Sequence, residues 1–202
     1  MALSGLFSFG VPGSLQRGAV STFNPRGLFV EDDALRARKV GKVKGLVISS
    51  AHTLLQEIHG DEAWVSDFTH SLAKSHHVGW SLGTEAAGGV LSLHSKAAFH
   101  KDTEFKCTPL VPGRVLLSEF SYLDRTTSFF NIHNFGWTKD ERQLVCQTIK
   151  HSLDRARGDP IRHLVFVCGD LNFDTPDKPG LRVKTATADP SIGKSAREKM
   201  HT

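Results

Sequence analysis

The sequence predicts an α/β fold. Short apolar runs typical of strands alternate with segments in which apolar residues recur every three or four positions, as in helices. Several strand-like runs end in a polar residue that is able to bind a metal ion or a phosphate. With 202 residues, 39% of them hydrophobic and 23% charged, the chain can form one domain with a core, or most of a larger domain.

The first quarter of the chain contains an extension, a strand and a helix. Residues 1–18 are rich in Gly and Ser and read as a flexible N-terminal extension, not as a secretory signal. Residues 19–23 form a predicted strand that stops at Asn24 and Pro25. A helix is expected from Asp32 or Asp33 toward Lys44. Its basic residues are read as a solvated face, with phosphate contact as the alternative: Arg36, Arg38, Lys39, Lys42 and Lys44.

The middle of the chain reads mainly as strands. Residues 53–57 form a buried strand that ends in Glu57, and a helix follows whose Trp64, Phe68 and Leu72 share one face and are expected in the core. The remaining strands of this part have alternating or apolar patterns and turn residues between them. They are expected at residues 78–82 and 89–93, joined by a turn at 83–88, and at residues 114–120 and 128–133.

The clearest helix signal begins at Thr138. Glu141 stands three residues later, as in a capping box, and Gly158 followed by Pro160 ends the pattern. The expected apolar face consists of Leu144, Val145, Ile149 and Leu153. Residues 161–168 then form a strand buried on both faces, and residues 175–202 read as a loop or a disordered tail. The predicted domain therefore covers residues 19–174.

Charge, cysteines and hydropathy limit the function classes. A net charge of +4 and a pI near 9.1 permit a polyanionic partner but do not require one. No apolar run reaches the roughly 18 to 20 residues needed to cross a bilayer, so no membrane span is expected. Cys107, Cys146 and Cys168 have no CxxC spacing and are expected to be reduced core residues. This pattern indicates an intracellular protein, in the nucleus or the cytoplasm.

Four strand ends carry side chains suited to phosphoester chemistry: Asn24, Glu57, His133, and Asp170 with Asn172. Mg²⁺ prefers oxygen ligands and keeps several waters, so Glu57 fits as its principal ligand. Asp170 and Asn172 lie two apart and would face one side of an extended strand. Asp170 would orient a nucleophilic water or help to hold the metal, while Asn172 and His133 would donate to phosphoryl oxygens.

Each of these positions also has a structural interpretation. An Asp followed by Asn at a strand end is often a turn former. A single Glu there is usually only solvated, and a lone His beside apolar residues is more often a packed, hydrogen-bonded side chain. No single position decides between the two interpretations.

In order and in approximate spacing, six segments resemble the signature of the endonuclease/exonuclease/phosphatase superfamily, which has the DNase I-like fold. The resemblance spans residues 20–174. The segments are Phe23-Asn24-x-x-Gly27-Leu28, Leu55-Gln56-Glu57-Ile58-His59-Gly60, Gly88-Gly89-Val90, Gly113-Arg114-Val115-Leu116, Asn131-Ile132-His133 and Gly169-Asp170-Leu171-Asn172.

The resemblance implies a four-layer α/β sandwich, in which two mixed sheets pack face to face with helices outside. It implies that Glu57 is the metal carboxylate, with Asn24 beside it at the metal or the phosphate. His133 would contact the scissile phosphate, and Asp170 and Asn172 would orient the water and bind the phosphate. The implied cofactor is Mg²⁺ or Mn²⁺, and the implied partner is nucleic acid or another phosphoester, bound by a monomer.

The end of the chain departs from the family pattern. Family members carry a later Asp-His pair whose His is implicated in activating water, but only 30 residues follow Asn172 and Pro190 follows Asp189. We therefore expect a C-terminally truncated domain without its last strands and with reduced activity. The first hypothesis is a Mg²⁺-dependent phosphodiesterase, most plausibly an endonuclease of the kind found in non-LTR retrotransposons. The alternatives are an inactive remnant that binds polyanions, a phosphatase of the same superfamily, and an unrelated α/β domain that carries these motifs by chance.

Overall fold

The computed structural model describes residues 3–6, 19–83 and 88–172. Their strands form two sheets, and both sheets mix parallel and antiparallel pairs. The first sheet has the order β1-β2-β3-β5-β4, with β1 Leu3–Leu6, β2 Ala19–Phe23, β3 His52–Gln56, β5 Val90–Ser95 and β4 His76–Ser81. The second has the order β6-β7-β8-β9, with β6 Glu104–Val111, β7 Val115–Tyr122, β8 Arg125–His133 and β9 His163–Asp170.

Two helices make the parallel connections. Strands β2 and β3 are parallel and are joined through α1, Asp33–Ser49, while β8 and β9 are parallel and are joined through α3, Lys139–Gly158. Parallel neighbours need such a crossover because the chain must return to the same end of the sheet. Helix α2, Glu62–His70, lies between β3 and β4, and the short 3-10 helix η1, Lys96–Ala98, follows β5.

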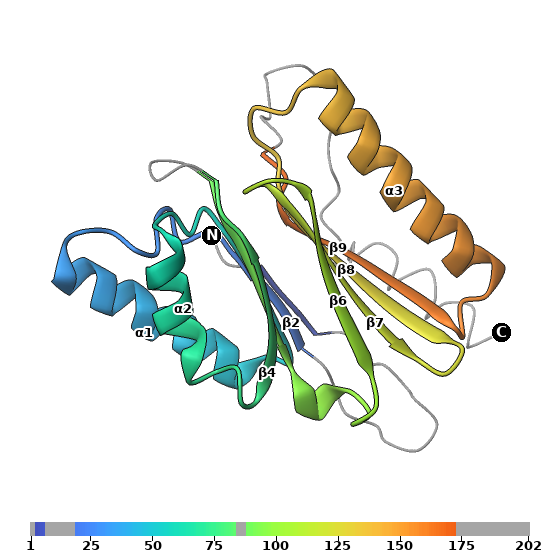
Figure 1. Ribbon diagram of the computed structural model, residues 1–202, viewed down its shortest axis with the longest axis horizontal. Coiled ribbons are helices and arrows are strands. Elements are labelled where there is room, and N and C mark those ends of the chain that lie inside the picture. The colour runs from blue at the N-terminus through green and yellow to red at the C-terminus, as the bar shows by residue number, and fades with distance from the viewer. Residues whose placement is uncertain (1–2, 7–18, 84–87, 173–202) are drawn as a thin grey trace, which may run out of the picture. The chain divides into compact units, whose positions relative to one another are not determined.

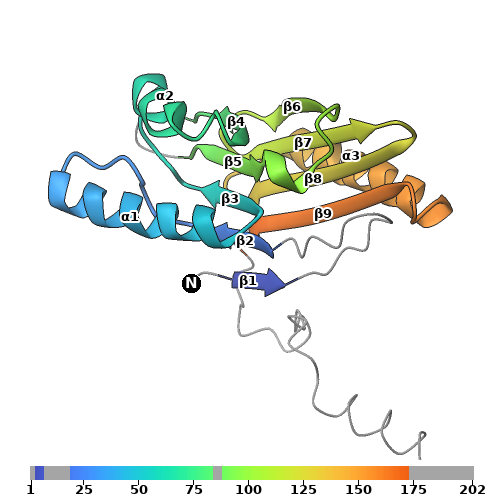
Figure 2. The same cartoon turned by 90° about the horizontal axis from the view of Figure 1, so that it is seen from below.

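The helices cover the outer faces of the two sheets, as Figures 1 and 2 show. Val43 of α1 and Phe68 of α2 join a buried apolar cluster with Leu55 and Leu93 on the outer face of the first sheet. Val145 of α3 joins a second cluster on the second sheet. Between the sheets, Leu54, Phe120 and Phe129 form a third cluster. The predicted four-layer α/β sandwich is therefore confirmed.

Local sequence signals fix the helix starts. Asp32 accepts a hydrogen bond from the Leu35 backbone N–H, and Asp61 does the same for Trp64. The predicted capping box is present, because Glu141 N donates to Thr138 Oγ1 at 3.2 Å and Thr138 N donates to Glu141 Oε2 at 2.7 Å. These bonds satisfy backbone donors that have no partner within their helix. Helix α1 runs five residues beyond the predicted end at Lys44.

Several predictions about burial are wrong. Trp64, Leu144 and Leu153 are exposed, although the pattern predicts each on a core face. Ile161 and Val167 are exposed too, so the predicted strand at residues 161–168 is not buried on both faces. The Arg36 guanidinium instead lies over the Trp64 ring, 4.3 Å from its centroid. This cation–π contact covers one face of the indole while the side chain stays exposed. Cys146 is also exposed, whereas Cys107 and Cys168 are partly buried. Burial raises the pKa of Cys168 to about 11, so its thiol is protonated at neutral pH.

Strand β6 was not predicted from the sequence. It is an edge strand that contains Pro109, and its register against β7 shifts between Pro109 and Val111. Proline is tolerated at edges and bulges because no ladder hydrogen bond is needed there. The edge strands β4 and β6 approach closely at Gly79, where an added Cβ would lie 2.2 Å from Cys107 Sγ. Only glycine permits this approach.

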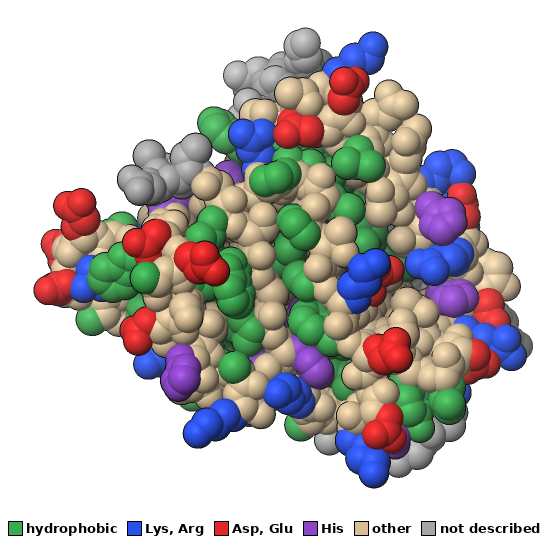
Figure 3. Space-filling view, viewed as in Figure 1, with side chains coloured by type: hydrophobic (Ala, Val, Ile, Leu, Met, Phe, Trp, Pro, Cys, Tyr) green, Lys and Arg blue, Asp and Glu red, His purple; other side chains and the backbone are tan. Residues whose placement is uncertain are grey.

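Part of the predicted termini lies outside the described residues. Residues 3–6, within the expected N-terminal extension, form β1 and pair with β2. Residues 7–18, 84–87 of the predicted turn, and 175–202 fall outside what the structure describes. Among the residues that are described, no helix is long and apolar enough to cross a membrane. On the face seen in Figure 3, hydrophobic side chains gather near the middle, and charged side chains of both signs surround them.

Candidate active site

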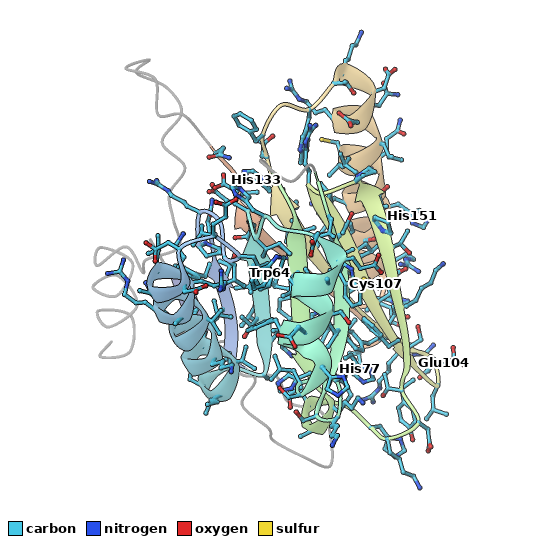
Figure 4. All side chains as sticks on the ribbon, turned by 60° about the vertical axis from the view of Figure 1, so that its left-hand side comes forward. Trp64, His77, Glu104, Cys107, His133 and His151 are labelled. Atoms are coloured by element: carbon cyan, nitrogen blue, oxygen red, sulfur yellow. The ribbon has the colours of Figure 1, made fainter. Side chains whose placement is uncertain are left out.

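The polar residues predicted at strand ends meet at one end of the sandwich. Asn24 follows β2 and Glu57 follows β3, and the pairing of Phe23 with Leu55 brings these two strand ends level. His133 and Asp170 end β8 and β9, and they are partners in the parallel register. Figure 4 shows His133 at this end of the sheets and His77 at the other. The candidate site is therefore built from both sheets.

His133 and Glu57 form the closest charged contact of the site. His133 Nε2 lies 2.9 Å from Glu57 Oε1, and the His133 side chain is 3% exposed against 26% for Glu57. The Glu57 carboxylate thus engages Nε2, whereas Nδ1 is buried without a hydrogen-bond partner. Such atoms are costly to bury unless a ligand completes them. Burial lowers the pKa of His133, and the nearby carboxylates of Glu57 and Asp170 oppose this shift.

Asp170 is held by hydrogen bonds from two sides. Asn24 Nδ2 donates to Asp170 Oδ2 at 2.8 Å, and the backbone N–H of Asn172 donates to Asp170 Oδ1 at 3.1 Å. Asn24 Oδ1 in turn accepts from the Arg26 backbone N–H at 2.8 Å. Asn24 thus presents its amide nitrogen to Asp170. Its carbonyl oxygen, the atom that a metal ion would need, accepts the Arg26 N–H and keeps one further lone pair.

The expectation that Asp170 and Asn172 share an extended strand is wrong. Strand β9 ends at Asp170, and Asn172 has a φ of 39°, in the left-handed region. The chain turns because the Asp170 carboxylate captures the Asn172 N–H, a local bond that Asp commonly makes. Asn172 is exposed beside Asp170 and does not point with it along one strand face.

Glycine is required immediately before Asp170. Gly169 has a φ of 141°, and an added Cβ would lie 1.9 Å from the backbone oxygen of Ile132. Any side chain would therefore push β9 away from β8 at the site. The close pairing of these strands places Asp170 level with His133.

The loop that carries Glu57 has an unusual backbone and is firmly held. Glu57 and His59 have φ values of 50° and 54°, which non-glycine residues seldom adopt. Backbone bonds from Gly27 N to Glu57 O at 2.7 Å and from Ile58 N to Gly89 O at 3.1 Å fix the loop on both sides. Strained conformations kept in this way are concentrated at functional sites.

A buried polar network lies directly beneath the site. Asn131 Oδ1 accepts from Gln56 Nε2 at 2.7 Å, and Asn131 Nδ2 donates to the backbone oxygens of Leu55 and Leu91 at 3.1 Å. Gln56 and Asn131 immediately support the site, since one precedes Glu57 and the other lies two residues before His133. Both are almost fully buried, so the network fixes β3 and β8 relative to one another.

A cleft of about 470 Å³ opens beside these residues. Its size is within the range of small-ligand sites. Glu57 and His133 line it together with residues for which the sequence suggested no role, namely His59, Leu82, Pro112, Arg114, Phe135 and the glycines at 83, 88 and 113. Arg114 lies within a motif of the family resemblance and Phe135 follows His133 by two residues, so proximity in sequence was the available signal.

The side chains of the site limit which metal ion could bind. Within the described ranges, no group of three or more His, Cys, Asp or Glu side chains could hold a metal ion. A tetrahedral zinc centre therefore does not fit. Mg²⁺ and Mn²⁺ need fewer protein ligands, because hydrated ions are bound through one or two carboxylates. Glu57, partly exposed at the cleft, fits such an ion, with Asp170 as the second carboxylate of the site.

The sequence matches no family model and no curated protein. Its fold is similar to that of truncated TDP2 from Caenorhabditis elegans, with a TM-score of 0.50, 20% identity, and 82% of this chain and 66% of that chain covered. It also resembles TDP2 from C. elegans (0.49, 19%, 82% and 51%) and the AP endonuclease LMAP from Leishmania major (0.49, 18%, 90% and 65%).

The chain spans about half to two thirds of the length of these structures. At such identities the similarity concerns the fold. Two packed mixed sheets with outer helices agree with it. The chain has the DNase I-like α/β-sandwich fold.

Proposed function

We propose that this chain is a metal-dependent phosphodiester hydrolase that cleaves nucleic acid as an endonuclease. One observation carries the proposal. The side chains of Asn24, Glu57, His133 and Asp170 come together from four strand ends of two sheets, Glu57 and His133 line a cleft, and His133 Nδ1 is buried without a hydrogen-bond partner. A buried nitrogen without a partner, next to a carboxylate and a cleft, is suited to bind a ligand.

Glu57 would hold Mg²⁺ or Mn²⁺, with Asp170 next to it. When bound, the ion would polarise a phosphoryl oxygen and offset negative charge in the transition state. His133 would donate a ring N–H to a non-bridging phosphoryl oxygen, as would the Asn172 side-chain amide. His133 lies 2.9 Å from Glu57, so the ligand of the ion and the donor to the phosphate are neighbours.

Asp170 would accept the proton of the attacking water. The water oxygen forms a bond to phosphorus, the phosphorus–oxygen ester bond on the opposite side breaks, and the departing alkoxide takes a proton from solvent. The hydrogen bonds from Asn24 and Asn172 leave each Asp170 oxygen one further lone pair, which suffices to orient a water. All these groups belong to one chain, so a monomer suffices.

Two segments refine the proposal. Leu55-Gln56-Glu57 with His59-Gly60, and Gly169-Asp170-Leu171-Asn172-Phe173, resemble most the endonuclease domains of non-LTR retrotransposons. DNA is therefore the substrate to test before other phosphoesters.

The alternative of an inactive polyanion-binding remnant relied on the basic residues of α1. Three of the five are engaged locally: Arg36 stacks on Trp64, Lys39 Nζ donates to Arg26 O at 2.7 Å, and Lys42 lies over the Phe23 ring at 4.5 Å. These contacts hold the three side chains against the protein, so fewer of their N–H donors are available to a ligand. The alternative predicts salt-sensitive DNA binding without turnover.

The purified 202-residue chain should be incubated with Mg²⁺ or Mn²⁺ and plasmid DNA, a generic phosphodiester, and a phosphomonoester. Cleavage of the first two that is lost in Asp170→Ala supports the proposal. Turnover of the phosphomonoester alone would favour a phosphatase. Identical behaviour of the two proteins toward all substrates would reject the enzyme proposal.

A further inference from the structure

Phe135 is an exposed aromatic residue at the candidate site. It is 63% exposed, and its ring lies nearly parallel to that of His133, at an interplanar angle of 10° and a centroid distance of 5.9 Å. It also lines the cleft that contains Glu57. Single exposed apolar residues are common on protein surfaces, but this one stands beside two polar groups of the proposed chemistry.

The loop under Phe135 is fixed by hydrogen bonds. The Phe135 N–H donates to His133 O at 3.0 Å, and Trp137 Nε1 donates to the same oxygen at 3.1 Å. The neighbouring Asn134 donates its backbone N–H to Asp170 O at 2.9 Å and its side-chain amide to Leu171 O at 2.7 Å. An aromatic ring on a fixed backbone loses little conformational entropy when a ligand stacks on it.

A guanidinium lies in the same part of the cleft. Arg114 Nη1 donates to Gly136 O at 2.8 Å, next to Phe135 in the chain, and lies 3.8 Å from Glu141 Oε2. The Arg114 side chain is 36% exposed, so other N–H groups of the guanidinium remain available to a ligand. Arginine is well suited to phosphate because its N–H groups match two phosphate oxygens.

We infer that Phe135 stacks on an unpaired nucleobase next to the scissile phosphate, while Arg114 binds a neighbouring phosphate. The preferred substrate class is therefore single-stranded or locally opened nucleic acid. Aromatic side chains bind single strands in this way because every base has a flat face that stacks. A lipid or sugar phosphoester has no base for Phe135. The inference deepens the proposed function and rests on it.

The stacking contact can be measured directly. A short oligonucleotide carrying 2-aminopurine is titrated with the full chain in EDTA, where binding is measured without cleavage, and quenching of the fluorescent base reports stacking. Phe135→Ala should weaken binding by about 5- to 100-fold and remove the quenching. Phe135→Trp should retain both, and Phe135→Leu, a matched apolar variant, should lose the quenching.

The controls separate stacking from other effects. Ile48→Ala removes an apolar side chain on α1 that is 87% exposed, more than Phe135, and should leave binding unchanged. Arg114→Gln should lower the slope of log affinity against log salt by about 1, and Arg114→Lys should restore it. Fully base-paired DNA should bind the wild type and Phe135→Ala equally.

Failure of the inference differs from failure of the proposed function. If the chain cleaves DNA while Phe135→Ala binds, quenches and cleaves as the wild type does, the stacking subsite is wrong and the hydrolase proposal survives. If no ester is hydrolysed but the 2-aminopurine signal depends on Phe135, the chain binds strands without being an enzyme. Binding of anionic vesicles that depends on Phe135, without oligonucleotide binding, would overturn the inference in favour of a lipid surface.

Discussion

The two ends of the layer between the sheets both bury histidine, but they treat it differently. At the site end, His133 faces Glu57 and Asp170, and its Nε2 lies 2.9 Å from Glu57 Oε1. At the opposite end, His52 Nδ1 lies 3.1 Å from His94 Nδ1, and aromatic rings surround the pair, with Phe129 at 4.5 Å and 4.8 Å between ring centroids. The two ends therefore differ in the groups that surround the imidazoles: carboxylates at the site end and aromatic rings at the opposite end.

This contrast indicates how a functional histidine differs from a packed one. The His52–His94 contact needs one proton shared between neutral rings. Burial lowers the pKa of His52 to about 4 and also lowers the pKa of His94 well below its ordinary value. For His94, the neighbouring His52, His77 and His76 add to the lowering. Lowered pKa values therefore occur at both ends. At the site end, the histidine also adjoins the carboxylates of Glu57 and Asp170, a cleft, and a loop with left-handed backbone at Glu57 and His59.

The largest expected effect concerns the site end. Asp170→Asn keeps a carbonyl oxygen for the hydrogen bond from Asn24 but cannot take a proton, so turnover should fall about 10²- to 10⁴-fold. The thermal midpoint should change little. His52→Gln, at the opposite end, should leave the rate at pH 7 unchanged. Equal losses in both variants would mean that the two ends are not functionally distinct.

The loss of stability at acid pH should depend on His52, at the end opposite the site. The folded-state pKa of His52, about 4, lies below the ordinary 6.5, so the unfolded chain binds more protons between these values. The stability from the neutral ring is complete above pH 6.5 and is lost as the pH falls to 4, by about 3 kcal/mol. Urea unfolding of wild type and His52→Gln at several pH values measures this. If both proteins lost the same free energy of unfolding between pH 6.5 and pH 4, His52 would not be the group responsible.

The network beneath the site should matter for both stability and rate. Asn131→Ala removes the acceptor of Gln56 Nε2 and the donor to the Leu55 and Leu91 oxygens, so the free energy of unfolding should fall by roughly 1–3 kcal/mol. The rate should also fall, since Glu57 and His133 adjoin the network. Full activity of the folded variant would show that the network serves stability alone.

The smallest effect is expected away from both ends. Thr138→Ala removes one half of the capping box of α3 and should cost about 1 kcal/mol in unfolding experiments. Neither the rate of hydrolysis nor the loss of stability at acid pH should change. A change in either would extend the site to the start of α3.

Local signals explain why much of the fold was predictable. The capping box of Thr138, the glycine stop of α3 and the apolar strands depend on neighbours in sequence. Strand β6 could not be predicted because Glu104, Lys106 and Pro109 interrupt its apolar pattern. An edge strand tolerates such residues. Trp64 was misplaced because its partner Arg36 lies on another helix.

The predicted site residues came from strand ends, which a sequence can indicate. Their contacts could not be predicted, because Gln56 and Asn131 are 75 positions apart and only the packing of the two sheets joins them. The left-handed backbone conformation at Glu57 and Asn172 could not be predicted from the sequence either. Such conformations are disfavoured locally and are imposed by hydrogen bonds from elsewhere in the fold.

The hydrogen bond between Asn24 and Asp170 spans 146 positions of sequence. Closing so long a stretch of chain is among the slower events in folding, because its entropy is lost before the contact stabilises anything. During synthesis, β2 leaves the ribosome long before β9, so the strands of the first sheet are made before the second sheet can be completed. The chemistry of the site should accordingly be the last property that a refolding or newly made chain acquires.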